Sequence, residues 1–590
     1  MLIDTAAAET KKLADNPAEY RLNRLFFLRL WRLWSPYWKR PEARKSWLII
    51  AVAVLTIAVG IPLQIWQSYT AKDLTNALIA KNAAEYWPLL ILETALTALL
   101  LLLSVGMRYL TGRVELQWRQ WLAAHLSERY LARRTYYAIT QDNSIDNPDQ
   151  RIQQETIAFC STMLSLPFIA IGAIATMITQ MSIMGSISTV LSMSVVSFAI
   201  FQSIVTFKLF QPTIKQQFDI TVAEADLRYG LLNVRDNAET IAFYQGEHAE
   251  QQHILRRLGL ATHKRLISLV YGTWVTLSNG GMSVAWAIVP VLCLVPQYLA
   301  GAIDYGTIAQ STFAATSLLG ALTIFVDLLP HLSSSFPGIA RLAQIDEKVE
   351  SLGVDQSIAG GRILRMESAL IVIDKMTLAT PGGERVLVRD LSLQVRPGHH
   401  LIIIGQTGLG KSALLRAIAG LWNRGSGAVA LPPSGETLFL PQRPYMFLGD
   451  LRSQLVYPAI ASSLDDAELQ AILDEVQLSN VATRHGGFDA IKDWSRILSL
   501  GEQQRIAIAR VLIARPRFVF LDEATSAVDS ATEKALYAAL QRSGSTLVSV
   551  GHRQDLLAYH TDALRLLPGG AFELLPAHLV RPTSGEIDAA

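Results

Sequence analysis

Six apolar runs, each long enough to cross a lipid bilayer, constrain how the first half of this chain folds. They lie near residues 47–69, 87–109, 160–184, 187–210, 270–297 and 305–330. Charged residues make up only 17% of the chain, whereas soluble domains carry about 25%, so the protein needs apolar surface that never meets water. The sequence therefore predicts six transmembrane helices and excludes an ordinary soluble enzyme or a disordered scaffold.

The charges of the loops predict which side of the membrane each loop faces. Ten Lys and Arg residues precede the first run, between Lys11 and Lys45, and the segments 112–155 and 212–266 hold six and seven. The alternate loops hold two, none and none. Because basic loops stay on the cytoplasmic side, both termini and the two long loops are predicted to be cytoplasmic.

The first 46 residues are polar and basic, and no cleavable signal peptide is predicted in them. One arc of a helix would carry Arg21, Arg24, Arg29 and Arg32, and most of the remainder would carry Leu25, Phe26, Leu30, Leu33 and Trp34. This pattern predicts an amphipathic elbow helix in the inner headgroup region of the membrane, in contact with lipid. A solvated basic lead-in is the alternative.

The sequence predicts four successive segments of the chain. Residues 1–46 form the cytoplasmic N-terminal segment, and 47–345 form the transmembrane domain, whose basic loops are rich in helix formers and are predicted to continue as helices. A linker at 346–364 leads to 365–590, where hydrophobicity falls and strands alternate with helices. The net charge of +2 predicts no nucleic-acid partner, and two cysteines inside apolar runs argue against disulfides.

A phosphate-binding loop opens the last segment. A strand-like run at 400–404 leads into Gly405-Gln406-Thr407-Gly408-Leu409-Gly410-Lys411-Ser412, and a helical run begins at Ala413. Glycines let backbone N–H groups wrap around phosphates, and the helix N-terminus adds a positive dipole. Lys411 is predicted to reach the β- and γ-phosphates of ATP, and Ser412 to bind Mg²⁺. A glycine-rich turn with a solvated lysine is the alternative.

A pair of acids ends a second buried strand. The apolar run 518–521 is followed directly by Asp522 and Glu523. In P-loop enzymes the first acid holds Mg²⁺, and the next orients or activates the attacking water. Adjacent buried carboxylates are costly without a cation, so a catalytic role is favoured over a structural one.

Further motifs stand in a fixed order around these two. They are Gln442, the run Leu498-Ser499-Leu500-Gly501-Glu502-Gln503, Asp529 and His552. Together the motifs resemble the ATPase domain of an ATP-binding cassette (ABC) transporter. With six spans before it, the chain resembles an ABC half-transporter, an ATPase coupled to solute movement.

The resemblance implies a role for each motif. Gln442 would be the Q-loop residue, which contacts Mg²⁺ together with Ser412 and Asp522 and takes part in catalysis. Residues 498–503 would be the signature, which meets the ATP bound by a partner chain, and Asp529 would lie in the D-loop. Glu523 would be the catalytic base, and His552 would lie near the γ-phosphate.

Other residues resemble one branch of the family, the SbmA/BacA-like (YddA-like) bacterial transporters and the related peroxisomal subfamily D transporters. These residues are Asp146–Ile152, Glu239–Glu247 and Leu440–Met446. The resemblance implies an α-helical six-span domain of ABC-exporter type joined to an α/β P-loop ATPase domain. It also implies a bacterial inner membrane.

Two departures from the family pattern stand out. The signature has Leu500 and Glu502 where the general pattern has Gly and Gln, although Ser499 and Gly501 are retained. No Phe, Tyr or Trp occurs from Ile371 to Pro397, where an aromatic residue usually stacks on adenine.

One chain holds one P-loop and one signature, so the family mechanism implies a homodimer with two composite ATP sites. The fourth, fifth and sixth spans carry many Ser, Thr, Asn and Gln side chains, with Glu93 and Asp327 as rare acids. This composition favours a hydrophilic solute such as a peptide or a corrinoid, and the resemblance suggests uptake. A lipid or fatty-acyl exporter and a membrane-tethered regulatory ATPase are the alternatives.

Overall fold

The computed structural model describes residues 24–142, 145, 148–355, 363–380, 385–422, 424–460, 464–551 and 553–580. Side chains are described throughout these ranges except at Asp142, Ile214, Phe218, 325–337, 352–355 and Gln554. The chain forms two compact units, Met1–Asp355 and Gln356–Ala590. The boundary between them falls inside the segment 346–364 that was predicted as a linker, and the first ten residues of that segment are helical.

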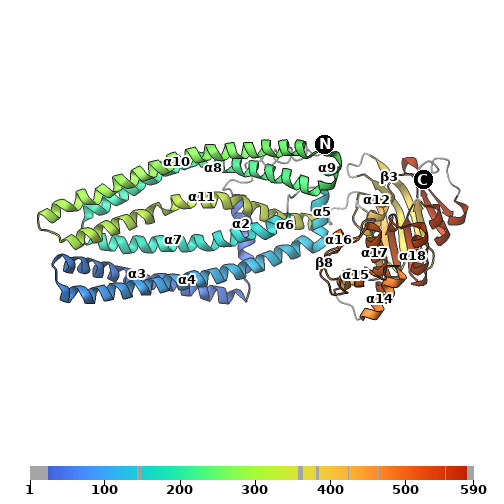
Figure 1. Cartoon of the computed structure of the whole chain (residues 1–590), viewed down its shortest axis with the longest axis horizontal. Coiled ribbons are helices and arrows are strands. Elements are labelled where there is room, and N and C mark those ends of the chain that lie inside the picture. Colours follow the sequence, from blue (N-terminus) through green and yellow to red (C-terminus); the bar gives the residue numbers. More distant parts are fainter. Residues whose placement is uncertain are drawn as a thin grey trace. The chain divides into compact units, whose positions relative to one another are not determined.

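The first unit is helical (Figure 1). Its helices are α2 (Arg24–Trp38), α3 (Ala43–Ile79), α4 (Ala83–Leu131), α5 (Thr135–Asp142), α6 (Pro148–Gln150), α7 (Thr156–Gly185), α8 (Thr189–Asp236), α9 (Ala238–Tyr244), α10 (Glu247–Leu299) and α11 (Tyr305–Asp355). Within the described residues, six of these helices, α3, α4, α7, α8, α10 and α11, are long and apolar enough to cross a membrane. Each coincides with one predicted run, although α8 begins two residues after the start of the fourth run, so the six-helix prediction is confirmed.

The long helices continue well beyond the apolar runs, as the composition of the basic loops predicts. Two ion pairs join the extended parts of α8 and α10, Lys264 with Asp219 at 3.1 Å and Arg265 with Glu224 at 2.7 Å. At the opposite end, α7 and α8 meet in a tight turn that is closed when the Ser188 hydroxyl accepts a hydrogen bond from the Leu191 N–H. From the turns onward, α3 packs along α4 and α8 packs along α10, whereas α7 packs mainly along α11 (Figure 1).

Arg151 belongs to the loop motif Asp146–Ile152 of the sequence analysis, and its side chain bonds to α11. It lies in the π-helical turn Arg151–Glu155 that enters α7, and only 3% of it is exposed. Its guanidinium donates to the Arg341 carbonyl at 2.8 Å and to Gln344 Oε1 at 2.7 Å, both on α11. The first residues of this motif, Asp146 and Asn147, lie outside the described residues.

Helix α2 covers most of the residues predicted to form the elbow helix, and it packs on the bundle through two kinds of contact. Its buried aromatic Tyr37 stacks near the fully buried Trp118 of α4, which also meets Phe159 of α7. Its Arg29 is buried and forms a two-point ion pair with Glu347 of α11, at 2.8 and 2.9 Å. Arginines of the predicted basic arc thus face protein carboxylates, while Arg21 lies outside the described residues.

The second unit is built around a parallel sheet with the strand order β12-β11-β4-β10-β9-β6, in which only β12 runs antiparallel. These strands are β12 (Phe572–Pro576), β11 (Asp562–Leu566), β4 (Leu401–Ile404), β10 (Thr546–Val550), β9 (Phe518–Asp522) and β6 (Thr437–Leu440). A smaller sheet has the order β1-β5-β2-β3, from β1 (Leu364–Glu367), β5 (Gly425–Leu431), β2 (Ile371–Ala379) and β3 (Val386–Val395). A short antiparallel pair is formed by β7 (Leu448–Gly449) and β8 (Lys492–Asp493).

The helices of this unit are α12 (Lys411–Ala419), α13 (Leu451–Val456), α14 (Asp466–Glu475), α15 (Val481–His485), α16 (Trp494–Ile497), α17 (Leu500–Ala514) and α18 (Ser530–Arg542). Two hydrophobic cores cover the two faces of the parallel sheet. Ile402 points toward the core shared with α13, α14, α17 and α18, whereas Leu401 and Ile403 point toward the core shared with α12 and the smaller sheet. Strands buried on both faces are typical of parallel sheets, so the predicted α/β architecture of this unit is confirmed.

Truncation of Arg29 tests how α2 is held. We expect Arg29→Ala to lower the free energy of unfolding by about 1–3 kcal/mol, because the half-buried Glu347 carboxylate loses both hydrogen bonds. Arg32→Ala is the matched control, since the Arg32–Glu350 pair at 3.1 Å is half exposed and such pairs contribute about 0–1 kcal/mol. Thermal unfolding of the detergent-solubilised variants measures both. Equal destabilisation by the two variants would contradict the distinction.

Candidate nucleotide-binding site

The phosphate-binding loop joins β4 to α12, as the strand–loop–helix pattern predicts. Gly405, Gly408 and Gly410 have φ values of +147°, +84° and +97°, which side chains rarely adopt. A Cβ on Gly405 would also lie 2.8 Å from the Leu566 carbonyl oxygen. The remaining loop residues, Gln406, Thr407 and Leu409, lie between these glycines, and Ala413 lies in the first turn of α12. The glycines therefore shape a loop whose N–H groups can face an anion.

Lys411 is buried at the start of α12, inside the curve of this loop. Its ammonium group donates to the Gly405 carbonyl and, at 3.2 Å, to the Gln406 carbonyl. The alternative of a solvated lysine on a glycine-rich turn does not fit a side chain that is only 8% exposed. The ammonium group is thus held where phosphates would enter the loop.

Two oxygen atoms meet between the first turn of α12 and the carboxyl end of β9. The Ser412 hydroxyl donates to Asp522 Oδ1 at 2.9 Å. Hydroxyl and carboxylate oxygens are ligands that Mg²⁺ prefers, and Mg²⁺ is usually held by one or two such groups together with substrate phosphates. The residues present therefore fit the predicted metal site.

Gln442 and Glu523 face each other beside this pair. Gln442 Nε2 donates to Glu523 Oε2 at 2.8 Å. Glu523 has a φ of +49°, an uncommon backbone conformation for a residue other than glycine, and its N–H donates to the Val550 carbonyl of β10 at 3.1 Å. Backbone strain of this kind persists where the surrounding structure imposes it. The hydrogen bond to Val550 thus helps to hold Glu523 in this conformation.

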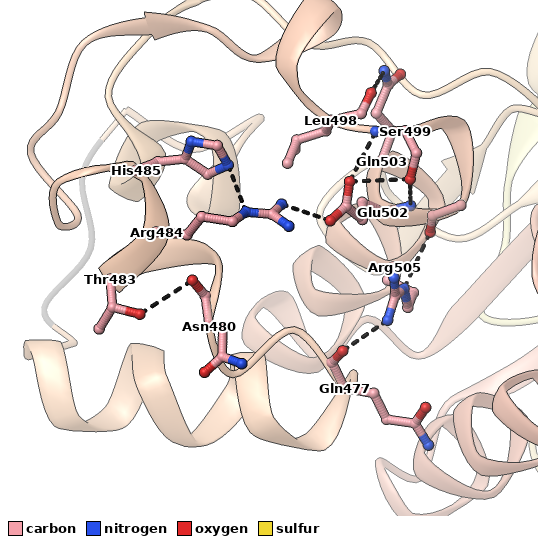
Figure 2. A network of polar contacts seen from close by, with 11 residues as sticks. Gln477, Asn480, Thr483, Arg484, His485, Leu498, Ser499, Glu502, Gln503 and Arg505 are labelled. Carbon is pink, nitrogen blue, oxygen red and sulfur yellow. Dashed lines mark hydrogen bonds and ion pairs between the residues drawn. The ribbon is translucent and has the colours of Figure 1, made fainter.

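The predicted signature residues form the start of α17 (Figure 2). Ser499 caps the helix in a reciprocal capping box, in which Glu502 N–H donates to Ser499 Oγ and Ser499 N–H donates to Glu502 Oε2. Gln503 donates to the carbonyls of Ser495 and Leu498, which fixes the turn before the helix. Leu498 is buried and Leu500 is half-buried, so the polar groups of Ser499 and Gly501 remain at the helix N-terminus.

Asp529 caps α18, accepting hydrogen bonds from the N–H groups of Ala531 and Thr532 at 3.1 and 3.0 Å. The segment just before it passes close to the signature. A Cβ on Gly501 would lie 2.7 Å from the Ala527 carbonyl oxygen, so only glycine fits at that position. His552, predicted near the γ-phosphate, lies outside the described residues. The placement of His552 near the γ-phosphate therefore stays a prediction.

Sequence reasoning gave no role to Gln504, which the structure places at the centre of the site. It is fully buried, and its amide donates to the Gln442 carbonyl at 2.9 Å and to the Ser526 hydroxyl at 3.2 Å. Its Oε1 accepts from the Ala527 N–H at 3.0 Å. One side chain thus joins the Q-loop, the signature helix and the D-loop. The available signal was helical spacing, since Gln504 shares one helix face with Ala507, Ile508 and Val511, which are all buried.

Arg510 is the second residue that sequence reasoning missed. It is buried on α17 and donates to the carbonyls of Gln454 and Tyr445, at 2.8 and 2.9 Å. Its guanidinium also lies 5.2 Å from the centre of the Tyr457 ring. Burial lowers the pKa of Arg510 to about 10, so it stays charged at neutral pH. It anchors the loop that follows Gln442.

Known families match both halves of the chain. Residues 35–299 match the family described as ABC transporter transmembrane region 2, and residues 388–526 match the ABC transporter family. The second match covers the P-loop, Gln442, the signature and the Asp522–Glu523 pair.

Proteins of several organisms are similar over most of their length. An uncharacterised ABC transporter ATP-binding protein of Synechocystis is 38% identical over 90% of this chain and 82% of its own length. The chloroplastic ABC transporter D family member 2 of Arabidopsis thaliana is 31% identical over 91% and 86%. The lysosomal cobalamin transporter ABCD4 of Homo sapiens is 30% identical over 78% and 81%.

A solved structure shares the fold. A bacterial Atm1-family ABC exporter with ATP bound has a TM-score of 0.73 and covers 90% of this chain and 96% of its own. At 17% identity, this likeness concerns the fold alone. It agrees with a six-helix transmembrane domain of exporter type joined to an α/β ATPase domain.

Replacement of the acid next to Gln442 tests the roles within the site. We expect Glu523→Gln to lower ATP hydrolysis by about 100-fold or more, the usual loss when a general base is removed, while ATP binding persists. Lys411→Ala should instead weaken ATP binding itself. Steady-state hydrolysis and binding of a fluorescent ATP analogue separate the two effects.

Glu436→Gln is the matched control, because Glu436 pairs with Arg517 on the surface at 3.5 Å and lies outside the motifs. It should hydrolyse ATP like the unmodified protein. If Glu523→Gln also keeps near-normal hydrolysis, the base is another residue.

Proposed function

The chain belongs to the ABC transporter family, and we propose that it works as a homodimeric half-transporter that couples ATP hydrolysis to uptake of hydrophilic solutes. The observation that carries the proposal is that one chain supplies one P-loop, one signature helix and one set of six spans. ATP held between a P-loop and a signature then needs two chains. A homodimer meets that need with two equivalent composite sites.

Within each composite site, binding of the phosphates, activation of water and binding of the metal fall to different residues of the chain. Lys411 and the N–H groups of the P-loop bind and orient the phosphates. Glu523, positioned by Gln442, accepts a proton from the attacking water, and Ser412 with Asp522 would hold Mg²⁺. When bound, Mg²⁺ neutralises charge on the β- and γ-phosphates. His552 would add a hydrogen bond to the γ-phosphate.

The protein is an integral membrane protein with several spans, and the loop charges support its orientation. Three basic segments alternate with loops that hold few or no basic residues, which favours termini and ATPase domain on the cytoplasmic side. The resemblance of the loop motifs to those of SbmA/BacA-like transporters supports a bacterial inner membrane. This placement makes the ATPase domain accessible to cytoplasmic ATP.

Many polar side chains of the spans form hydrogen bonds to the backbone of their own helices. Hydroxyl groups that donate to a carbonyl four residues earlier include those of Ser192, Ser194, Thr273, Thr276, Ser278, Ser283, Thr316 and Thr323. These groups are satisfied within the chain, so they give no support for a solute pathway by themselves.

A smaller set of polar atoms supports a hydrophilic solute. Oε1 of Gln180, Oε1 of Gln310 and Oγ of Ser311 are buried and have no hydrogen-bond partner among the described side chains and backbone. In an apolar surrounding such atoms are costly, and water or a polar solute would satisfy them. Glu93 adds a carboxylate held by Gln67 Nε2 at 3.1 Å between α3 and α4, whereas the side chain of Asp327 lies outside those described.

A peptide or a corrinoid fits these groups, because both solutes are large and carry many amides. The relative named as a cobalamin transporter supports the corrinoid class. An acyl chain offers no partner for buried amide oxygens, so the lipid or fatty-acyl exporter is the weaker candidate. A regulatory ATPase without transport leaves the same atoms unexplained.

Complementation between two inactive variants tests the dimer. Lys411→Ala and Ser499→Arg should each lose ATP hydrolysis when expressed alone. Co-expressed, they should regain part of it, because a mixed dimer contains one composite site with both an intact P-loop and an intact signature. A fully active monomer of 64.9 kDa in detergent would refute the homodimer.

Solute uptake tests the direction and the substrate class. Cells that make the protein should accumulate labelled cobalamin or a labelled peptide above the level of cells that make Lys411→Ala. Matched expression of the two variants is the control. If only lipids or acyl chains stimulate hydrolysis and no hydrophilic solute accumulates, the exporter alternative replaces this proposal. Hydrolysis without movement of any solute would favour the regulatory ATPase.

A further inference from the structure

The signature of this chain carries a carboxylate where the general pattern has an amide. Glu502 lies in the first turn of α17, and its side chain is only 16% exposed. Its Oε2 accepts hydrogen bonds from the Ser499 N–H at 2.9 Å and the Ser499 hydroxyl at 3.0 Å (Figure 2). The carboxylate therefore occupies both donors of the residue that would meet the γ-phosphate.

This arrangement creates an electrostatic conflict. An anion is stabilised at a helix N-terminus by the free N–H groups and the helix dipole. A second anion must overcome the repulsion of the first, and it must also take over the Ser499 donors. Neutral Gln at position 502 could form the same capping box, but it would bring no negative charge to the helix N-terminus. The chain must compensate the charge of Glu502 for its signature to bind a phosphate.

Arg484 supplies a compensating charge from a different element. It lies on α15, and its guanidinium donates to Glu502 Oε1 at 2.7 Å (Figure 2). Burial would raise the pKa of Glu502, but the hydrogen bonds from Arg484 and Ser499 outweigh it and lower that pKa. Glu502 is thus ionised at neutral pH, and its two oxygens are shared between Ser499 and Arg484.

The surroundings hold Arg484 in place. Its Nε donates to His485 Nε2 at 3.0 Å, and the His485 ring packs edge-on against the buried Trp494. Arg505 of α17 fastens the segment before α15, donating to the Gln477 carbonyl at 2.7 Å. The Arg484 side chain is half exposed, and such ion pairs add little stability, so folding alone gives no reason for this fixed geometry.

We propose that Arg484 is a positioning residue of the composite ATP site: it neutralises Glu502 and holds that carboxylate when the γ-phosphate takes the Ser499 donors. The inference rests on the proposed function, in which the signature meets ATP of the partner chain. It adds the residue that makes a signature with Glu502 competent to bind phosphate.

Charge compensation gives a specific test in the full-length protein, reconstituted in lipid nanodiscs. Hydrolysis is measured against ATP concentration for Arg484→Gln, Glu502→Gln, the double variant and Arg484→Lys. We expect Arg484→Gln to raise KM for ATP on the order of tenfold, with a smaller change in kcat, because an uncompensated carboxylate repels the phosphate. Arg484→Lys should recover part of the loss.

The double variant tests whether Arg484 acts through the charge of Glu502. Its KM should return to within about twofold of the Glu502→Gln value, since no charge is left to compensate. Arg542→Gln is the matched control: Arg542 forms a comparable surface pair with Glu475 at 2.9 Å and should leave KM unchanged.

Failure of the inference and failure of the proposed function give different results. If hydrolysis depends on Glu523 but Arg484→Gln behaves like the unmodified protein, the inference is wrong. It is also wrong if the double variant is as impaired as Arg484→Gln, because Arg484 then acts independently of the Glu502 charge. If co-expressed Lys411→Ala and Ser499→Arg do not restore hydrolysis, the composite site of the proposed function fails instead.

Discussion

The parallel pairing of β4, β10 and β9 determines where the phosphate-facing side chains lie. Val550 of β10 pairs with Ile403 on one side and with Asp522 on the other, so the ends of three buried strands meet at one edge. Ligands of open α/β sheets bind at the carboxyl ends of the strands. The P-loop, Asp522 and Glu523 come together because of this register, and Gln504 then ties the Q-loop and D-loop to the same edge.

Local pattern was sufficient for the features that depend on one stretch of chain. The six apolar runs predicted α3, α4, α7, α8, α10 and α11, because hydrophobic length alone makes a helix able to span a bilayer. The P-loop followed from its glycines, whose positive φ values the structure bears out. In both cases the constraint and the residues that meet it are adjacent in sequence.

Features that join distant residues could not be predicted in this way. Glu347 meets Arg29 across 318 positions, and no periodicity links the two. The same holds for Arg484 and Glu502, which belong to different helices, and for the three loops that converge on Gln504. The departure at position 502 was visible in the sequence, but its compensation became visible only once α15 and α17 were placed together.

The close approach of Ala527 to Gly501 has a consequence for how variants of this signature are interpreted. Any side chain at position 501 collides with that backbone, because its Cβ would lie 2.7 Å from the Ala527 carbonyl oxygen. A substitution there displaces the D-loop even when no nucleotide is bound. If a substitution of Gly501 abolishes activity, displacement of the D-loop is enough to explain the loss. Such a result therefore does not show that Gly501 contacts phosphate.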